Sequence, residues 1–411
     1  MAKGGAPVQG VFSSAVSLSV TTIGAGVLAI PSLFEQSGIY FVFLVLIAVA
    51  ALTVLSIDYL VLCVDHLNLK SYEDISRELL GRSFEEAIRW VLIVYSVGIA
   101  AGYVVVVGEI VTPLIPFLHS FVPFLSTETH VVFFLWFLLM MPLSCVPQIN
   151  HLEHMSLVAI SSTFLISGAI VYRYYYPFSP HEKRSTDYAY FPLSSKALVT
   201  LPVMFFSFDC QSLVFSLYTG LTEVTRSAMT KVTTLSVTIT GSVYFIVGYF
   251  GYISNTPHIT GNILKNYSPL SDNLMMTSEL LYTSTVMIAY VLVLLPCRDA
   301  VFILMYGYST TTHDQRHSSI SYRQILIVSV VLSVLSFLLA LKAKSIVFLI
   351  ALLGSVCSSI LCFLYPAAFR ISLHVRGIKS CTPLELFAAW LMMLIGVVGG
   401  IVGTIVTFKH L

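Results

Sequence analysis

Charged residues are scarce in this chain of 411 residues: Asp, Glu, Lys and Arg together make up 10% of it, while 57% is hydrophobic. Water-soluble domains carry about 25% charged residues, so the composition excludes an ordinary soluble fold. The net charge is only +1, which gives no electrostatic reason to expect a nucleic-acid partner. The chain is therefore predicted to lie in a lipid bilayer.

Motifs for catalysis and for metal binding are also absent. No nucleophile elbow, phosphate-binding loop or zinc signature occurs, so the sequence predicts neither an enzyme nor a bound cofactor. The seven cysteines have no metal-ligand spacing and are interpreted as buried free thiols. His151 and His154 are three residues apart but have no further ligand nearby, so we expect no metal site. No cleavable signal peptide is evident, and we expect the first apolar segment to remain as a span.

Long apolar segments recur from end to end, and they do not alternate as the strands of a membrane barrel would. We predict an all-α polytopic membrane protein with eleven transmembrane helices. The predicted spans are 9–35, 39–65, 88–112, 131–147, 155–176, 196–221, 231–254, 276–297, 323–341, 345–371 and 383–408. Lys and Arg are more frequent in the loops that a cytoplasmic N-terminus would place inside, although the loop 173–196 opposes this bias.

The segment 71–90 is the most polar helical pattern between spans. Its apolar residues Tyr72, Ile75, Leu79 and Leu80 fall on one side of a helix. This pattern predicts an amphipathic helix that lies on the cytoplasmic membrane surface.

Two spans carry features that a continuous membrane helix avoids. The first contains "TTIGAGVLAIP" (21–31), in which Gly24, Gly26 and Pro31 all disfavour a helix interior. The sixth has Asp209 near its midpoint, where a charge costs about 2.5–3.5 kcal/mol on insertion scales. Because these spans are five apart, they indicate a transporter built from two inverted five-helix repeats with broken helices at the substrate site. Close helix packing is the alternative explanation for two glycines at this spacing.

Backbone groups at such a break would bind an α-amino acid. Unwinding at Gly24, Ala25 and Gly26 would free N–H groups at the start of a half-helix, which attract a carboxylate. Carbonyl groups near Thr21 and Thr22 would suit an amine. Glycine also lets the ligand approach the backbone closely.

Several ordered motifs are similar to those of a known family. "TTIGAGVLAIPSLFEQSG" (21–38), "SYEDISRELLG" (71–81), "GYVVVVGEIV" (102–111), "FSFDCQSLVFSLYTGL" (206–221), "GNILKNY" (261–267), "LLPCRDAV" (294–301) and "LLGSVCSSILCFLYPAAF" (352–369) stand in this order. They resemble the amino acid/auxin permease family of eukaryotic amino-acid transporters, in particular its sodium-coupled neutral amino-acid and vacuolar branches. The resemblance covers almost the whole chain. It implies a leucine-transporter-type fold of ten core helices plus an eleventh, and coupled transport of amino acids.

The sixth span departs from that family's pattern. Asp209 stands where the family usually has an apolar residue, and Gln211 where it commonly has His. A carboxylate beside the pocket would favour a cationic side chain such as that of arginine or lysine. Alternatively Asp209 carries a coupled proton, or it caps a broken helix end by accepting backbone N–H bonds.

The eighth span bears on the coupling ion. In sodium-coupled members of the family a hydroxyl on this helix joins first-helix carbonyls around the ion. The aligned positions here are Met287 and Ala289, and the hydroxyls of Thr283 and Ser284 lie one turn earlier. We therefore favour coupling to protons, or uncoupled exchange, over sodium.

The remaining candidates have weaker signals. Glu109, near the outer end of span three, is either a proton site, part of an outer gate or a carboxylate that reaches the interface. Phe206, Ser207 and Phe208 are expected beside the substrate, with Ser207 presenting its backbone to the amine. Ser355 in span ten is a coupling or gating candidate, although packing explains it equally well.

Taken together, the sequence predicts a secondary transporter that moves amino acids by alternating access, as a symporter with protons. Residues 1–8 would form a short cytoplasmic tail, 9–371 the transporter core with repeats 9–176 and 196–371, and 372–411 the eleventh helix and C-terminus. A neutral amino-acid transporter, an amino-acid sensor with the same pocket and a channel are the alternatives. The expected partners are an amino acid and the lipid bilayer, in the plasma membrane or the vacuolar or lysosomal membrane. The sequence identifies no protein partner.

Overall fold

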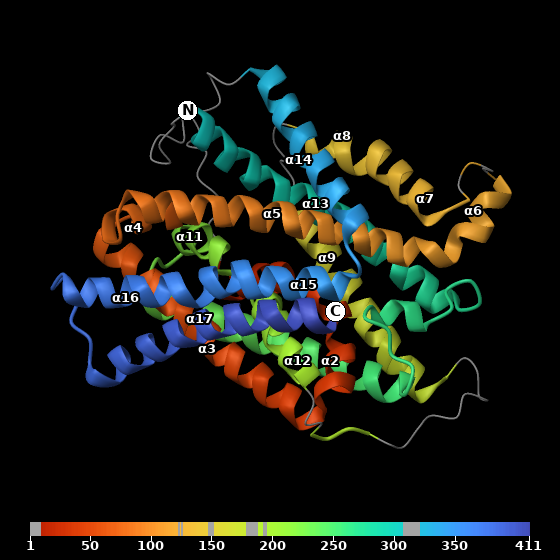
Figure 1. The fold of residues 1–411 in the computed structure, drawn as a ribbon, viewed down its shortest axis with the longest axis horizontal. Coiled ribbons are helices and arrows are strands. Elements are labelled where there is room, and N and C mark those ends of the chain that lie inside the picture. The colour runs from red at the N-terminus through yellow and green to blue at the C-terminus, as the bar shows by residue number, and fades with distance from the viewer. Residues whose placement is uncertain are drawn as a thin grey trace.

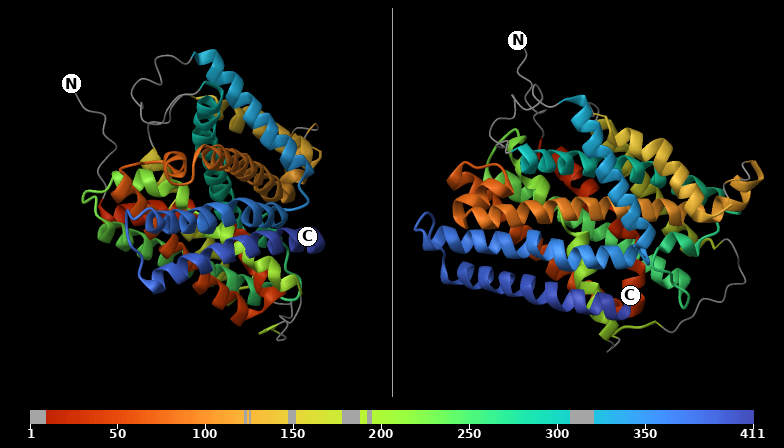
Figure 2. Two further views of the ribbon diagram at one scale, coloured as in Figure 1. Left: turned by 60° about the vertical axis from the view of Figure 1, so that its left-hand side comes forward. Right: turned by 45° about the horizontal axis from the view of Figure 1, so that its top comes forward.

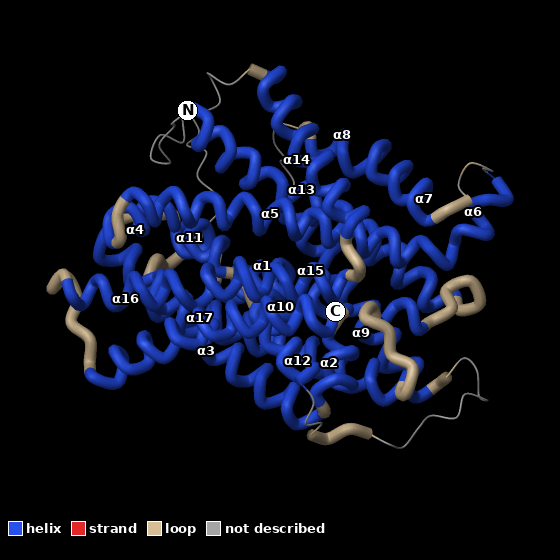
Figure 3. The backbone as a smooth tube through the Cα atoms, viewed as in Figure 1, coloured by secondary structure: helices blue, strands red, loops and turns tan. Residues whose placement is uncertain are grey.

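The structure is a computed structural model that describes residues 10–121, 124, 126–146, 152–177, 188–191, 195–306 and 321–411. Within these residues the secondary structure is helical throughout and contains no strand (Figure 3). The all-α prediction is therefore confirmed for the described part of the chain. The histidine pair at 151 and 154 falls outside the side chains that are described.

The helices follow the predicted apolar segments closely. In chain order the α-helices are α1 (Val11–Ile23), α2 (Ile30–Ser37), α3 (Ile39–Leu67), α4 (Tyr72–Leu79), α5 (Arg82–Val111), α6 (Ile115–Phe121), α7 (Glu128–Leu135), α8 (Met141–Ser144), α9 (Leu152–Tyr175), α10 (Thr200–Ser207), α11 (Gln211–Thr219), α12 (Arg226–Asn255), α13 (Asn273–Tyr306), α14 (Tyr322–Lys342), α15 (Ile346–Leu353), α16 (Tyr365–Val375) and α17 (Pro383–His410). The 3₁₀ segments are η1 (Gly24–Leu28), η2 (Thr112–Leu114), η4 (Ser195–Val199) and η5 (Ile263–Asn266), and the π-helical segments are η3 (Trp136–Met140) and η7 (Gly354–Leu364).

Nine helical stretches in the described residues are long and apolar enough to cross a membrane. The predicted spans 131–147 and 155–176 are not among these nine; they correspond to the shorter apolar stretch Glu128–Ser144 and to α9. The helices thus form a multi-pass membrane protein. The exact count of eleven spans stays a prediction.

The long helices run side by side along one axis of the molecule. Figures 1 and 2 show α5, α15 and α17 in neighbouring rows, with α14 crossing α5 at a steep angle. The helix α5 packs against α13, α14 and α15, and α17 packs against α16 and η7. One end of this arrangement carries α4 and the turn between α16 and α17, and the opposite end carries α6 and the segment between α12 and α13 (Figure 1).

The polar segment 71–90 does not form one surface helix, and that prediction is wrong. Gly81 has φ 104°, a conformation that favours glycine, and it separates the short helix α4 from α5. The apolar face of α4 packs against protein instead of lipid, because Tyr72 is buried and donates a hydrogen bond of 2.7 Å to the Leu361 carbonyl. The amphipathic pattern is the same for both environments, so it did not distinguish them.

Small residues allow the last helix to approach the core. A Cβ built on Gly399 of α17 would lie 2.5 Å from a ring carbon of Phe205, and one on Gly403 would lie 2.9 Å from the Cβ of Ser355. Contacts as short as these require glycine, which is the usual way for membrane helices to pack closely. The helix α17 is therefore fixed directly on α10 and η7.

Candidate functional site

The first predicted break is a real interruption of the helix. The helix α1 ends at Ile23, Gly24 has φ 37° and ψ −146°, and the chain continues as a 3₁₀ segment before α2 begins at Ile30. A positive φ favours glycine, so Gly24 permits the local change of direction. Pro31 lies in the first turn of α2, where its missing N–H breaks no helical hydrogen bond.

The sixth predicted span is interrupted at the matching place. The helix α10 ends at Ser207, residues 208–210 are not helical, and α11 begins at Gln211. The two breaks touch each other, because a Cβ on Gly26 would lie only 2.9 Å from the Oγ of Ser207. Ala25 is also buried there, with 4% of its surface exposed. The structure thus brings Gly24, Ala25, Gly26 and Ser207 together.

Two tyrosine hydroxyls hold the carbonyl groups of the broken ends. The Tyr244 hydroxyl on α12 lies 2.6 Å from the Ser207 carbonyl oxygen, 2.9 Å from that of Thr22 and 3.2 Å from that of Ile23. The Tyr282 hydroxyl on α13 donates a hydrogen bond of 2.7 Å to the Gly24 carbonyl. The Thr22 and Ser207 carbonyls, which the sequence predicts to bind a substrate amine, therefore already accept hydrogen bonds in this conformation.

Neither tyrosine carries a sequence pattern that marks it for this role. Each lies in an apolar predicted span, where a Tyr is ordinarily a packing or interface residue. Tyr103 of α5 completes the group, since its hydroxyl lies 3.6 Å from where a Cβ on Gly24 would be. All three tyrosine side chains are buried.

Asp209 lies in the non-helical turn between α10 and α11. Both of its carboxylate oxygens are buried and neither accepts a hydrogen bond of standard geometry. The side chains of Tyr95, Ser358 and Cys362 lie beside the carboxylate, as does the backbone N–H of Gln211. The Ser358 hydroxyl is buried without a hydrogen-bond partner as well. A buried carboxylate with unused acceptors is a costly feature, which makes this turn a candidate binding site.

The side chain of Gln211 forms hydrogen bonds with polar groups around the second break. Its Oε1 accepts hydrogen bonds from the Cys210 backbone N–H at 2.9 Å and from the Cys362 thiol at 3.1 Å. Its Nε2 donates to the Ser56 hydroxyl of α3 at 3.3 Å. The Gln211 side chain therefore bonds the Cys210 N–H within the turn, while Asp209 lies beside the Gln211 backbone N–H.

The other predicted residues of the substrate site differ in their placement. Thr21 is exposed and its hydroxyl bonds to the Ser17 carbonyl at 2.9 Å, so its side chain does not face the break. Thr22 is buried and bonds to the Leu18 carbonyl at 2.6 Å. Phe208 is fully buried, and its ring meets that of Tyr244 edge-on at 5.5 Å. Phe206 is half-buried against the ring of Tyr95, 6.0 Å away.

The predicted coupling residues on the later helices do not reach the break with their side chains. The Thr283 hydroxyl bonds to the Glu279 carbonyl at 2.8 Å, and that of Ser284 bonds to the Leu280 carbonyl at 3.0 Å on an exposed face. Both bonds stay within α13. Ser355 faces the last helix, where its Oγ accepts a hydrogen bond of 3.0 Å from Thr404.

Glu109 belongs to a separate cluster at the C-terminal end of α5. Its carboxylate lies 2.9 Å from the Lys265 ammonium and accepts a hydrogen bond of 2.9 Å from the Asn262 side chain. Glu109 is 7% exposed, and both partners come from η5 or the residue just before it. The pair therefore joins α5 to the segment between α12 and α13. Whether Glu109 is a proton site, part of a gate or a carboxylate at the interface stays a prediction.

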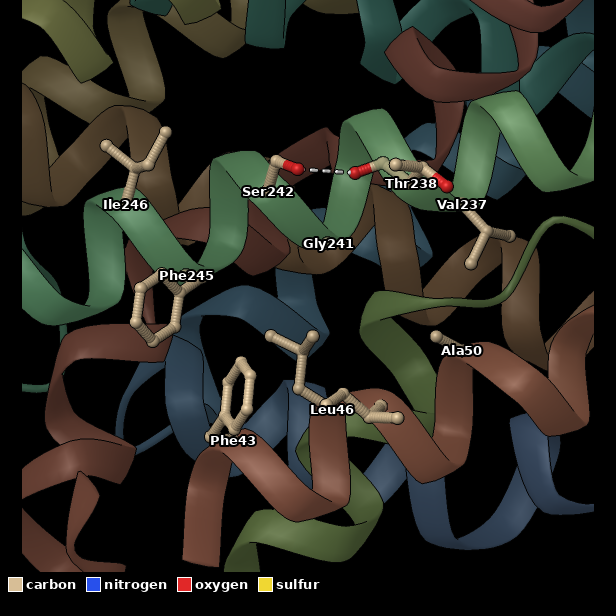
Figure 4. Close-up of a pocket in the computed structure, with 10 residues that line it drawn as sticks. Phe43, Leu46, Ala50, Val237, Thr238, Gly241, Ser242, Phe245 and Ile246 are labelled. Atoms are coloured by element: carbon tan, nitrogen blue, oxygen red, sulfur yellow. Dashed lines mark hydrogen bonds between the residues drawn. The ribbon is translucent and has the colours of Figure 1, made fainter. Parts of the chain in front are cut away.

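A hollow of about 470 Å³ opens between α3 and α12 (Figure 4). Phe43 and Leu46 point from α3 toward Phe245 and Gly241 of α12. Its lining is mostly apolar, and the nearby hydroxyls of Thr238 and Ser242 bond to carbonyls of their own helix. A charged amino acid would find no partner there, so this hollow is not the substrate site.

Two broken helices that touch at one point are typical of helical secondary transporters. The chain belongs to the family described as "Transmembrane amino acid transporter protein", whose sequence model matches residues 7–409. This confirms the resemblance to the amino acid/auxin permease family and supports amino acid transport over any enzymatic activity.

Individual relatives agree with this membership. The chain is 27% identical to vacuolar amino acid transporter 5 of Schizosaccharomyces pombe over 92% of this chain and 88% of the relative. It is 23% identical to vacuolar amino acid transporter 5 of Saccharomyces cerevisiae over 88% of each chain. Its fold is similar to that of a Na⁺-coupled sialic acid symporter in a substrate-bound outward-open state, with a TM-score of 0.60 and 14% identity. That similarity covers 97% of this chain and 88% of the symporter.

Proposed function

We propose that this chain is a secondary active amino-acid transporter that works by alternating access, with its substrate between the broken ends of α1 and α10. The observation that carries this proposal is the contact between Gly26 and Ser207, which places two interrupted helices at one point. The two halves of the chain, 9–176 and 196–371, would then be inverted repeats whose relative movement exposes that point to each side in turn.

The backbone at the two breaks would bind the groups that all α-amino acids share. The segment Gly24–Gly26 begins the outer half-helix, where N–H groups favour the substrate carboxylate. The Thr22 and Ser207 carbonyls end the inner half-helix and α10, and they would receive the amine when the Tyr244 hydroxyl moves aside. Tyr244 therefore holds the site closed until a substrate competes for the same oxygens.

Asp209 would contact the substrate side chain and select for its charge. Its two carboxylate oxygens are buried without a hydrogen-bond partner, and Ser358 beside it is unpartnered too. An arginine or lysine side chain would supply the positive charge that the carboxylate lacks among its described neighbours. We therefore favour cationic amino acids over neutral ones.

Protons are the coupling ion that the eighth helix favours. A sodium site of the family's type needs a hydroxyl from this helix beside carbonyls of the first. Thr283 and Ser284 bond to their own helix instead, and Ser284 is exposed. The group that does reach the break is the Tyr282 hydroxyl, which occupies the Gly24 carbonyl.

The vacuolar membrane is the proposed location, because the two fungal relatives are named vacuolar amino acid transporters. With the N-terminus in the cytoplasm, the end of the molecule that carries Glu109 and Lys265 would face the vacuolar lumen. An acidic lumen would supply the coupling protons.

The deciding experiment is uptake by purified protein in sodium-free liposomes, with and without a proton gradient, of labelled arginine against labelled alanine. Arginine uptake that the gradient drives supports the proposal. A preference for alanine would contradict the cationic reading and leave a neutral amino-acid transporter. A requirement for added sodium would contradict proton coupling, and ligand binding without any uptake would indicate a sensor.

Asp209→Asn tests the carboxylate directly, because it keeps the size of the side chain and removes its charge. We expect this variant to lose its preference for arginine over alanine while alanine uptake persists. Glu223→Gln, at an exposed position in the turn after α11, is the matched control. Gln211→Glu is unsuitable as a control, because the Gln211 side chain donates a hydrogen bond to Ser56. An arginine preference that survives in Asp209→Asn would remove Asp209 from the site.

A further inference from the structure

A second buried carboxyl lies on α13, outside the residues assigned above. Glu279 is 3% exposed, and its Oε1 is buried without a hydrogen-bond partner. No Lys, Arg or His of the described residues lies within ion-pair distance of it. An ionised carboxylate buried without a cation or sufficient donors costs several kcal/mol in folded proteins.

The described charged groups near the start of α13 are paired with each other and not with Glu279. The Asp272 carboxylate lies just before the start of α13. Arg173 of α9 is already bound to Asp272, with its Nε 2.6 Å from Oδ2 and its Nη2 2.6 Å from Oδ1. Arg173 is thus held by a carboxylate other than that of Glu279.

Among the described residues, the other elements that pack on α13 form no ion pair with Glu279. On α5, the Tyr103 hydroxyl lies beside Gly24, and Glu109 is paired with Lys265. The η3 and α14 segments meet α13 at Tyr290, through Trp136, Ser333 and Ser336. That contact lies about 16 Å further along the helix at 1.5 Å per residue. The η1 segment, GAGVL, has no titratable side chain.

Glu279 is nevertheless coupled to the break through a single helical turn. Its backbone carbonyl accepts the Thr283 hydroxyl, and Tyr282, three residues on, donates its hydroxyl to the Gly24 carbonyl. Three residues along a helix place two side chains on neighbouring positions of one face. A movement of α13 that hydrates Glu279 therefore also shifts the hydroxyl that holds Gly24.

From this geometry we propose that Glu279 is the group that carries the coupling proton, while Asp209 reads the substrate. In the conformation described, Glu279 is held as a carboxylic acid; when the outer end opens, water reaches the side chain and the proton is exchanged with that compartment. A group that is neutral when buried and ionised when hydrated links proton binding to the conformational change. The inference rests on the proposed proton-coupled transport.

The test uses the full chain in proteoliposomes and compares two modes of transport. Glu279→Gln mimics the protonated acid permanently. We expect it to lose arginine accumulation driven by a proton gradient, while exchange of labelled against unlabelled arginine at equal pH continues. Glu279→Asp should restore gradient-driven uptake with a shifted pH profile. Glu128→Gln, which removes an exposed glutamate at the start of α7, is the control and should behave as the unchanged protein.

The outcomes separate this inference from the proposed function. Gradient-driven accumulation that persists in Glu279→Gln overturns the role of Glu279 and leaves the transporter intact. If the unchanged protein moves no amino acid in either mode, the proposed function itself fails. If Glu279→Gln does not fold, a pH-sensitive dye inside liposomes with the unchanged protein and Glu279→Asp decides. A pH profile of proton entry identical in these two proteins would overturn the inference, and a shifted profile would support it.

Discussion

Gly354 of η7 lies so close to Pro202 of α10 that a Cβ on the glycine would collide with the Pro202 carbonyl oxygen. The obstacle is backbone, which cannot rotate out of the way as a flexible side chain can. At this point the π-helical segment rests directly on α10, the helix that ends at the second break. The register of α10 against η7 therefore depends on the absence of one methyl group.

Gly354→Ala should accordingly displace α10 and impair both folding and transport. Over-packing of a well-packed core costs typically about 1–3 kcal/mol, and a backbone obstacle puts this site at the upper end. The melting temperature of the detergent-solubilised protein measures the loss. Gly168→Ala in α9 is the matched control, because no atom lies within 4 Å of its added Cβ. Equal melting temperatures for the two variants would contradict the contact.

Gly26→Leu should abolish amino-acid uptake while folded protein still reaches the membrane. A Cβ here already meets the Ser207 hydroxyl at 2.9 Å, so a larger side chain would fill the space between the two breaks. Uptake into proteoliposomes, with size-exclusion profiles as the check on folding, measures the effect. Gly168→Leu serves as the comparison. Normal uptake by Gly26→Leu would show that the substrate does not bind there.

Tyr244→Phe should weaken the closed arrangement of the two broken helices. The change removes the hydroxyl from the carbonyls of Thr22, Ile23 and Ser207 and keeps the ring that packs on Phe208. Buried acceptors left without a donor cost about 1–3 kcal/mol, so the thermal stability of the substrate-free protein should fall.

Tyr249→Phe on the same helix provides the control for that change, since Tyr249 is only half-buried and stacks on Phe245. A saturating amino-acid substrate should recover more of the stability of Tyr244→Phe than of the unchanged protein, because the amine competes for the same oxygens. A stability loss equal to that of Tyr249→Phe would argue against the closing role of Tyr244.

The pair of Glu109 and Lys265 should behave as an energetic unit. In a double-mutant cycle with Glu109→Gln and Lys265→Met, we expect a coupling energy of about 0.5–3 kcal/mol, because the carboxylate is buried and only the ammonium is partly exposed. Chemical denaturation or thermal melting at low and high salt provides the measurement. Strictly additive effects would mean that the pair does not help to close the outer end.

Local chemistry made the two helix breaks predictable from the sequence. Glycines at 24 and 26 and a proline at 31 disfavour a continuous helix wherever they occur, and Asp209 at the depth of the bilayer centre is costly in any membrane helix. The rule does not extend to Glu279, which is only the fourth residue of the predicted span 276–297, close enough to its end for the side chain to reach the interface.

Contacts between distant parts of the chain were not predictable in this way. The hydroxyl of Tyr244 meets the carbonyl of Thr22, 222 residues away, and no local pattern distinguishes this tyrosine from one that faces lipid. The π-helical turn of η7 has no sequence signature either, because its extra residue per turn depends on the packing around Gly354. The prediction of a membrane-surface helix at α4 was wrong for a related reason, because an amphipathic pattern does not show whether protein or lipid covers the apolar face.

The Tyr244 hydroxyl has a single hydrogen atom, yet three carbonyl oxygens lie within 3.2 Å of the hydroxyl oxygen. At any instant, two of the three acceptors must do without that hydrogen. An ammonium group has three N–H donors, one for each oxygen. By this stoichiometry a substrate amine that displaced the tyrosine hydroxyl, as we propose, would give each of the three oxygens a hydrogen of its own.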